Sequence, residues 1–200
     1  MRAAKEALER KTSTTNDLLG DPAWSELRPY TEFRELIRDH AAASKACLTP
    51  RGEAGERLSM IGRVLDEKDA PRDKVLVYAY QTSAKGWYSD KAPHVSGNSG
   101  DFKHARLFGY CRTDAEGRFE LESVRPGGYP RSTLPQHIHF ELKGDDRATS
   151  VGEIWFDDDP RLTPEERAKS VQELCTIVTP RRGEDGAWRC EAALRLRREK

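Results

Sequence analysis

The sequence predicts a mainly β protein, a β-sandwich preceded by a short N-terminal helical arm, and three observations lead to that fold class. From about Leu58 onward, short runs alternate apolar and polar residues with the period of two that half-buried strands show. Clusters of Gly, Pro, Asp and Asn separate these runs, as in β-sandwiches. The first fifty residues instead carry helix formers. We therefore expect residues 1–50 to form the arm and residues 51–200 the sandwich.

Length and charge limit the classes of function. The chain has 200 residues, 36% of them hydrophobic, enough for one domain with a core and a short extension. Lys+Arg and Asp+Glu are both 34, so no overall field attracts nucleic acid or an anionic membrane. No apolar run is long enough to cross a bilayer, and Met1 to Lys11 lacks a signal-peptide core. We expect a soluble, cytoplasmic protein that acts on a small molecule.

Two segments of the arm predict helices, Met1 to Arg10 and Trp24 to Ala46, with Thr31 as a possible N-cap. One stripe of mostly apolar residues lies on a single face of the second segment: Leu27, Phe33, Leu36, Ile37 and His40. Alone, such a helix buries little, so the arm should pack on the main domain or on a second subunit. In the latter case it would form a homodimer.

The strands follow in order along the chain. Ser59 to Leu65 is the first, and Val75 to Gln81 is nearly continuous apolar sequence, which predicts a central strand. Thr113 to Gly117 has the composition of a turn, and alternation resumes from Arg118 to Glu122, so we expect a hairpin there. The later runs with a period of two are Val151 to Phe156 and Trp188 to Leu196, and the last of them should close the sandwich.

Two segments interrupt the strand pattern. Thr163, Pro164 and Glu166 supply an N-cap, a first-turn proline and a third-position acid, which predicts a short surface helix running towards Val171. The segment between Tyr88 and Leu107 is rich in Gly, Ser, Asn and His and has no period. Loops of that length in compact domains usually have a function, so we expect this one to line the site.

His137 and His139 lie in the strand-like run Gln136 to Leu142. Side chains two apart on a strand emerge from the same face, so both imidazoles can reach one point. The core behind them should be filled by the residues of the other face: Ile138, Phe140 and Leu142. This is a geometry for binding a metal, although two histidines at a polar edge can also bind nothing.

Tyr129 lies just upstream, between Pro126-Gly127-Gly128 and Pro130, where the glycines permit close backbone approach and the prolines stiffen the turn. A phenol and two imidazoles suit an oxidised transition metal better than a thiolate-seeking ion. Tyr88 follows the predicted central strand and can reach the same end of the sandwich. Each tyrosine also has an ordinary interpretation, as an aromatic at a sandwich edge or in a loop.

Four motifs together resemble the intradiol ring-cleavage dioxygenases. In order and approximate spacing, from roughly Leu58 to Pro160, they are Gly86-Trp87-Tyr88, Thr113-Asp114-Ala115-Glu116-Gly117-Arg118-Phe119, Pro126-Gly127-Gly128-Tyr129-Pro130 and His137-Ile138-His139-Phe140. The resemblance implies a β-sandwich of that type, with non-haem Fe(III) bound by Tyr88, Tyr129, His137 and His139. A free phenol has a pKa of about 10, so two tyrosinates at neutral pH need a strongly charged ion such as Fe(III).

The resemblance also implies a reaction. The substrates would be O2 and a catechol-like or hydroxyquinol-like aromatic diol, whose ring is cleaved between the hydroxylated carbons to a muconate-type diacid. Tyr129 would be the catalytic tyrosine that leaves the metal and helps to take a proton from the diol. The protein would supply positioning and electrostatics, and the iron with its ligands the difficult chemistry.

Two positions depart from the family pattern. Leu134 stands where many members have an arginine that stabilises the substrate, and Glu153 stands where many have a neutral glutamine. We expect Arg131 to supply the missing cation as a catalytic residue, with Arg106 as the other candidate. Each arginine could equally be a solvated surface residue.

Two other functions compete with this interpretation. Transthyretin-like and carboxypeptidase-regulatory-like binding modules share a TDxxGxF-type turn and a PGxY-type edge, but they need neither the two histidines nor Tyr88. A zinc hydrolase using the same four side chains is disfavoured because tyrosinate is a rare zinc ligand.

Overall fold

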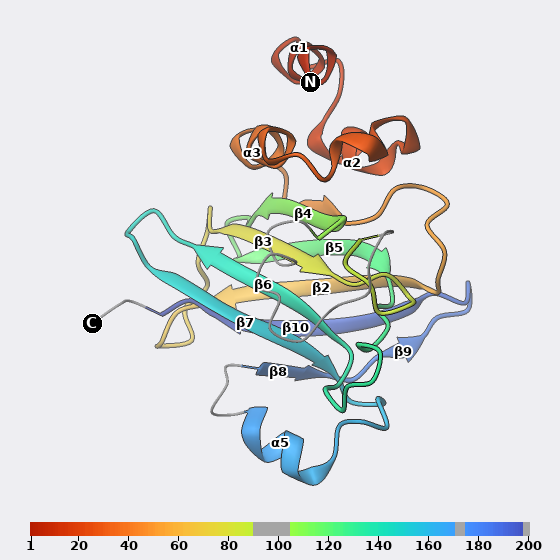
Figure 1. Cartoon of the computed structure of the whole chain (residues 1–200). Coiled ribbons are helices and arrows are strands. Elements are labelled where there is room, and N and C mark those ends of the chain that lie inside the picture. The colour runs from red at the N-terminus through yellow and green to blue at the C-terminus, as the bar shows by residue number, and fades with distance from the viewer. Residues whose placement is uncertain (90–104, 171–174, 198–200) are drawn as a thin grey trace.

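The computed structural model describes residues 1–89, 105–170 and 175–197. Two five-stranded sheets form a sandwich, α1, α2 and α3 lie together beyond β4, and α5 lies beyond β8 (Figure 1). The mainly β class predicted from the sequence is therefore confirmed. In the described ranges, no helix has the length and apolar character needed to cross a bilayer.

The first sheet has the strand order β1-β5-β2-β10-β9. Its strands are β1 (Lys45–Cys47), β5 (Arg118–Val124), β2 (Arg57–Leu65), β10 (Trp188–Arg195) and β9 (Arg181–Arg182). β5 pairs with β2 in antiparallel fashion, whereas β10 pairs with β2 in parallel from Trp188↔Leu58 to Arg195↔Leu65. The late strand β10 is thus internal to the sheet.

The second sheet has the order β4-β3-β6-β7-β8 and carries the predicted site. Its strands are β4 (Leu107–Arg112), β3 (Leu76–Gln81), β6 (His137–Lys143), β7 (Thr149–Phe156) and β8 (Cys175–Val178). β3 lies between β4 and β6, as its apolar sequence predicted.

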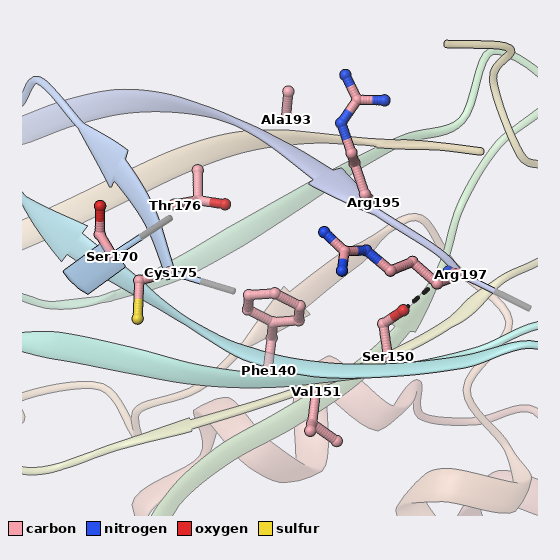
Figure 2. A pocket seen from close by; sticks show the side chains of 9 residues that line it. All are labelled: Phe140, Ser150, Val151, Ser170, Cys175, Thr176, Ala193, Arg195 and Arg197. Carbon is pink, nitrogen blue, oxygen red and sulfur yellow. Dashed lines mark hydrogen bonds between the residues drawn. The ribbon is translucent and has the colours of Figure 1, made fainter. Parts of the chain in front are cut away.

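Alternation along β6 divides its residues between two faces. Ile138, Phe140 and Leu142 are buried in the core between the sheets, as predicted. Figure 2 shows Phe140 pointing into a pocket that Ser150 and Ala193 help to line. The pocket has a volume of about 190 Å³. His137 and His139 leave the strand on the opposite face because of the two-residue period. The histidines therefore lie on the outer face of the second sheet, away from the core between the two sheets.

The helical prediction for the arm is correct at its start and wrong at its end. The observed elements are α1 (Arg2–Glu9), α2 (Thr15–Gly20), the 3-10 helix η1 (Pro22–Leu27) and α3 (Thr31–Asp39). The predicted helix from Trp24 to Ala46 is broken before α3 and ends at Asp39, and Ala46 belongs to β1, which pairs with β5. The N-cap of α3 is Tyr30 rather than Thr31. Long-range pairing determines β1, and local helix propensity does not reveal it.

The arm packs on the sandwich of its own chain. Phe33 and Ile37 on α3 are fully buried, and the Arg34 guanidinium lies 4.0 Å from the centroid of the Phe108 ring on β4. Arg28 is also buried and donates to three backbone carbonyl groups: those of Leu19, Leu48 and Arg106. Packing on the main domain, one of the two predicted alternatives, is therefore found.

The predicted hairpin at Thr113 to Gly117 is wrong, although the turn exists. Gly117 N–H donates to Asp114 O at 3.0 Å, and the Asp114 carboxylate accepts from the backbone of Arg118 at 2.7 Å. The turn, however, joins β4 to β5, which belong to different sheets. Turn chemistry specifies a reversal of the chain and leaves the pairing partner open. The predicted helix after Thr163 is confirmed as α5 (Pro164–Ser170), with Thr163 Oγ1 accepting from Glu166 N–H.

Candidate metal centre

Four side chains from three separate segments converge on the outer face of the second sheet. Nε2 of His137 lies 2.8 Å from the phenol oxygen of Tyr129 and 3.1 Å from Nε2 of His139. Nε2 of His139 lies 2.8 Å from the phenol oxygen of Tyr88 and 3.2 Å from that of Tyr129. The two phenol oxygens are also in hydrogen-bond contact. All four residues predicted from the sequence thus meet at one point.

The loops that carry the two phenols dock on each other. Gly86 N–H donates to Ser83 O at 2.9 Å, closing the turn that leads from β3 to Tyr88. Gly86 has a φ of +80°, and a Cβ there would lie 2.2 Å from the carbonyl oxygen of Gly128, directly before Tyr129. Only glycine suits both the backbone angle and the close approach. Gly86 therefore determines how the two phenols sit relative to each other.

The two imidazoles are oriented by different acceptors. Nδ1–H of His137 donates to the carbonyl oxygen of Pro135 at 2.7 Å, which leaves Nε2 as the lone-pair nitrogen. Nδ1 of His139 faces the Glu153 carboxylate at 3.4 Å, so its Nε2 also points to the phenols. The ring of Tyr80 stacks on His139 with centroids 4.7 Å apart and an interplanar angle of 12°.

Burial determines the charge state of the phenols. Tyr88, Tyr129 and His137 are 2%, 5% and 5% exposed. Burial, reinforced by the adjacent Tyr129, raises the pKa of Tyr88 far above its ordinary value. A phenolate at this position therefore requires a strongly positive partner at the cluster.

The donor set fits a trivalent transition metal. Two nitrogen lone pairs 3.1 Å apart and two phenol oxygens in contact repel one another unless a proton or a cation lies among them. Hard phenolate oxygen with borderline imidazole nitrogen is a combination that oxidised iron accepts. Glu153 brings a carboxylate oxygen within 4.8 Å of a ring nitrogen of both His137 and His139, and it faces Nδ1 of His139.

Two carboxylates lie near the centre, and the sequence singles out only one of them, Glu153. Asp159 is buried and accepts from the backbone N–H of Gln136 at 2.5 Å, which fixes the entry of β6 just before His137. In the sequence, Glu153 stands out only as a departure from the family pattern. Its position depends on the β6–β7 register, which pairs His139 with Glu153, and no local signal in the sequence shows that register.

The two arginines proposed as cations have different surroundings. Arg106 forms a two-pronged ion pair with Glu53 at 2.6 and 2.7 Å, so its charge is already matched. Arg131 is exposed and has a φ of +62°, next to the Tyr129 loop, and Leu134 is also exposed. Most of the loop predicted to line the site, residues 90–104, lies outside the described residues.

The chain resembles several known proteins in sequence. A family model described as dioxygenase matches residues 33–195. The chain is 34% identical over 156 residues to the protocatechuate 3,4-dioxygenase beta chain of Burkholderia cepacia, covering 68% of this chain and 65% of that one. It is 26% identical over 160 residues to catechol 1,2-dioxygenase 1 of Acinetobacter lwoffii, covering 72% and 50%.

The fold also has a counterpart among solved structures. The crystal structure of catechol 1,2-dioxygenase from Pseudomonas arvilla C-1 superposes with a TM-score of 0.60 at 19% identity, covering 80% of this chain and 58% of that one. At that identity the likeness concerns the fold. The chain spans between half and two thirds of the length of the curated relatives it matches.

Proposed function

The chain belongs to the intradiol ring-cleavage dioxygenase family, and on that premise we propose that it cleaves a catechol-like or hydroxyquinol-like ring between the two hydroxylated carbons. The products would be muconate-type diacids containing both atoms of O2. The observation that supports this proposal is the convergence of two phenols and two imidazoles within hydrogen-bonding distance of one another.

The proposed cofactor is Fe(III), held by Tyr88, Tyr129, His137 and His139. When bound, the ferric ion would supply the Lewis acidity that lets the diol lose its O–H protons, and the deprotonated diol would be electron-rich towards O2. The protein's own contribution is to keep both Nε2 atoms directed at the phenols and to exclude water through burial.

Tyr129 is the proposed proton acceptor. Its phenol oxygen lies 2.8 Å from Nε2 of His137 and touches that of Tyr88, so it is the phenol with most partners in the cluster. When the diol binds, its O–H proton would pass to the Tyr129 phenolate oxygen. Arg131 is the proposed source of positive charge beside the substrate, because Arg106 is already paired with Glu53.

We also propose that the chain forms a homodimer through its N-terminal arm, where the Tyr30 side chain is exposed at the start of α3. Sedimentation of the full chain tests this proposal directly. A monomer at tens of micromolar would exclude the dimer, and a dimer that Tyr30→Ser weakens would support it.

The test of function combines metal analysis, a visible spectrum and oxygen uptake. Iron-loaded protein should absorb visible light through tyrosinate-to-Fe(III) charge transfer and should consume O2 with at least one of a panel of catechols. Tyr88→Phe and Tyr129→Phe should each change the spectrum, whereas Tyr110→Phe, on β4, should leave it unchanged.

The same measurements separate the competing functions. A fully iron-loaded but colourless protein contradicts ligation by tyrosine. Coloured protein without oxygen uptake on any diol favours a non-catalytic binding module. Purification with stoichiometric zinc, together with hydrolytic activity, favours the hydrolase.

A further inference from the structure

Glu153 lies directly across the β6–β7 ladder from His139. Its Oε1 atom is 3.4 Å from Nδ1 of His139, and its Oε2 atom accepts a hydrogen bond from Nε1–H of Trp155 at 2.6 Å. Trp155 is 1% exposed, so the donor that holds the carboxylate is itself fixed in the fold. The carboxylate therefore has a defined place behind one imidazole of the centre.

The two imidazoles differ in the group that faces their Nδ1 atoms. His137 donates to the carbonyl oxygen of Pro135, a neutral acceptor, whereas His139 faces a carboxylate. A carboxylate behind an imidazole fixes the orientation of the ring and increases electron donation to a metal on the far nitrogen. The separation of 3.4 Å exceeds that of an ordinary N–H···O hydrogen bond, so the interaction acts mainly through charge.

We propose that Glu153 is a positioning residue of the metal centre, which keeps Nε2 of His139 directed at the phenols and makes the centre favour ferric over ferrous iron. This inference rests on the proposed function, because it assumes iron held by Tyr88, Tyr129, His137 and His139. Glu153 acts through His139 and does not itself bind the metal. Its charge adds to that of the two phenolates, which a trivalent ion offsets better than a divalent one.

Glu141 provides a matched control. It lies on β6, two residues beyond His139 and on the same face, and it pairs in register with Val151. Glu141→Gln thus removes one negative charge from the same face of the sheet without removing the group behind His139. The Glu153 side chain is 28% exposed, so Glu153→Gln changes charge and leaves packing intact.

The experiment uses the iron-loaded full chain as wild type, Glu153→Gln, Glu153→Asp and Glu141→Gln. We expect Glu153→Gln to lose iron to excess EDTA about tenfold faster and its charge-transfer band to move to longer wavelength. The ratio of its affinities for ferric and ferrous iron should fall about tenfold. That change corresponds to a rise of about 59 mV in the one-electron reduction potential of the iron. Glu153→Asp keeps the charge and should retain most of the ferric preference, and Glu141→Gln should match wild type within about twofold.

Three outcomes would overturn the inference. In the first, Glu153→Gln retains the wild-type iron half-life, spectrum and potential. In the second, Glu141→Gln shifts them equally, so that only the general charge of the face matters. In the third, Glu153→Gln folds by circular dichroism but binds no iron, so that Glu153 is a ligand. Failure of the proposed function looks different, because it appears in the wild type itself, either as missing tyrosinate–iron absorption or as no oxygen uptake with any diol.

Discussion

Three of the four donors at the centre are held in place by groups outside the cluster. The Pro135 carbonyl orients His137, while Glu153 and the Tyr80 ring orient His139. Tyr88 is kept in place by the turn at Gly86. Because these supports are independent, removing one donor should alter metal binding much more than it alters the fold.

His137→Ala should abolish tight iron binding. Without its imidazole the cluster has three donors, and loss of a ligand costs more than the 10–100-fold typical of outer-shell changes. Iron content after gel filtration, measured by atomic absorption, checks this. His40→Ala removes the histidine that follows α3 and should leave the iron content unchanged. Stoichiometric iron in His137→Ala would show that His137 is not a ligand.

The placement of individual site residues could be predicted from the sequence where it depends only on the two-residue period of a strand. The spacing of His137 and His139 placed both imidazoles on one face because strands alternate strictly. The contact between His139 and Glu153 depends instead on how β6 and β7 are aligned, and a shift of one residue would place a different side chain there. Sequence shows the alternation of a strand but not its register against the next.

At the scale of elements, the centre depends on the docking of two loops that the chain separates widely. The loop after β3 carries Tyr88 and the loop before β6 carries Tyr129, and they meet where Gly86 approaches Gly128. The sequence predicted close backbone approach at the glycines before Tyr129, but it did not identify Gly86 as the residue that they would meet. The strand β1 at the end of the predicted helix and the partner of β5 were not predictable, since both depend on strand pairing within the first sheet.

Gly86→Ala should destabilise the protein and disturb the centre more than Gly52→Ala does. Both glycines have positive φ, +80° and +84°, so each substitution should cost about 1–2 kcal/mol in backbone strain. Only at Gly86 would the new Cβ meet a carbonyl oxygen at 2.2 Å, which adds about 1–3 kcal/mol of overpacking. Urea unfolding with iron analysis measures both effects. Equal losses in the two variants would mean that the loops do not need this approach.

Arg28→Met should lower the free energy of unfolding by about 3–5 kcal/mol. The guanidinium is buried and donates to carbonyl oxygens from α2, the segment after β1 and the segment before β4, which would all lose their donor. Arg51→Met, at an exposed position, should cost less than about 0.5 kcal/mol. Chemical denaturation of both variants tests the difference. A small loss for Arg28→Met would show that other groups satisfy these carbonyls.

At the scale of the whole molecule, the burial of tyrosine side chains determines how the free energy of unfolding changes at high pH. Tyr110 and Tyr78 stack with centroids 4.4 Å apart between the arm and the sheet. Burial raises the pKa of Tyr110 to about 12, although the nearby Arg34 cation works against this, and burial also raises the pKa of Tyr78. Because the pKa of Tyr110 is higher in the folded chain than in the unfolded chain, its contribution to the free energy of unfolding is fully present below pH 10. That contribution is lost as the pH rises towards 12.

Wild-type protein should therefore lose more stability between pH 9 and pH 11 than Tyr110→Phe does. The unfolded tyrosine ionises above pH 10 while the folded one stays neutral, which costs about 1.4 kcal/mol per pH unit for this one group. Urea midpoints of both proteins at the two pH values give the comparison. Parallel losses would indicate that Tyr110 ionises normally in the folded state.

The parallel pairing of β10 with β2 bears on the order of events during biosynthesis. β2 emerges from the ribosome early and gains its antiparallel neighbour β5 soon after, but its other edge stays open until β10 has been translated. At roughly 5–20 residues per second, that edge is exposed for several seconds. A nascent chain stalled before Trp188 would leave one edge of β2 unpaired and the core between the sheets exposed. We expect chaperones to bind such a chain.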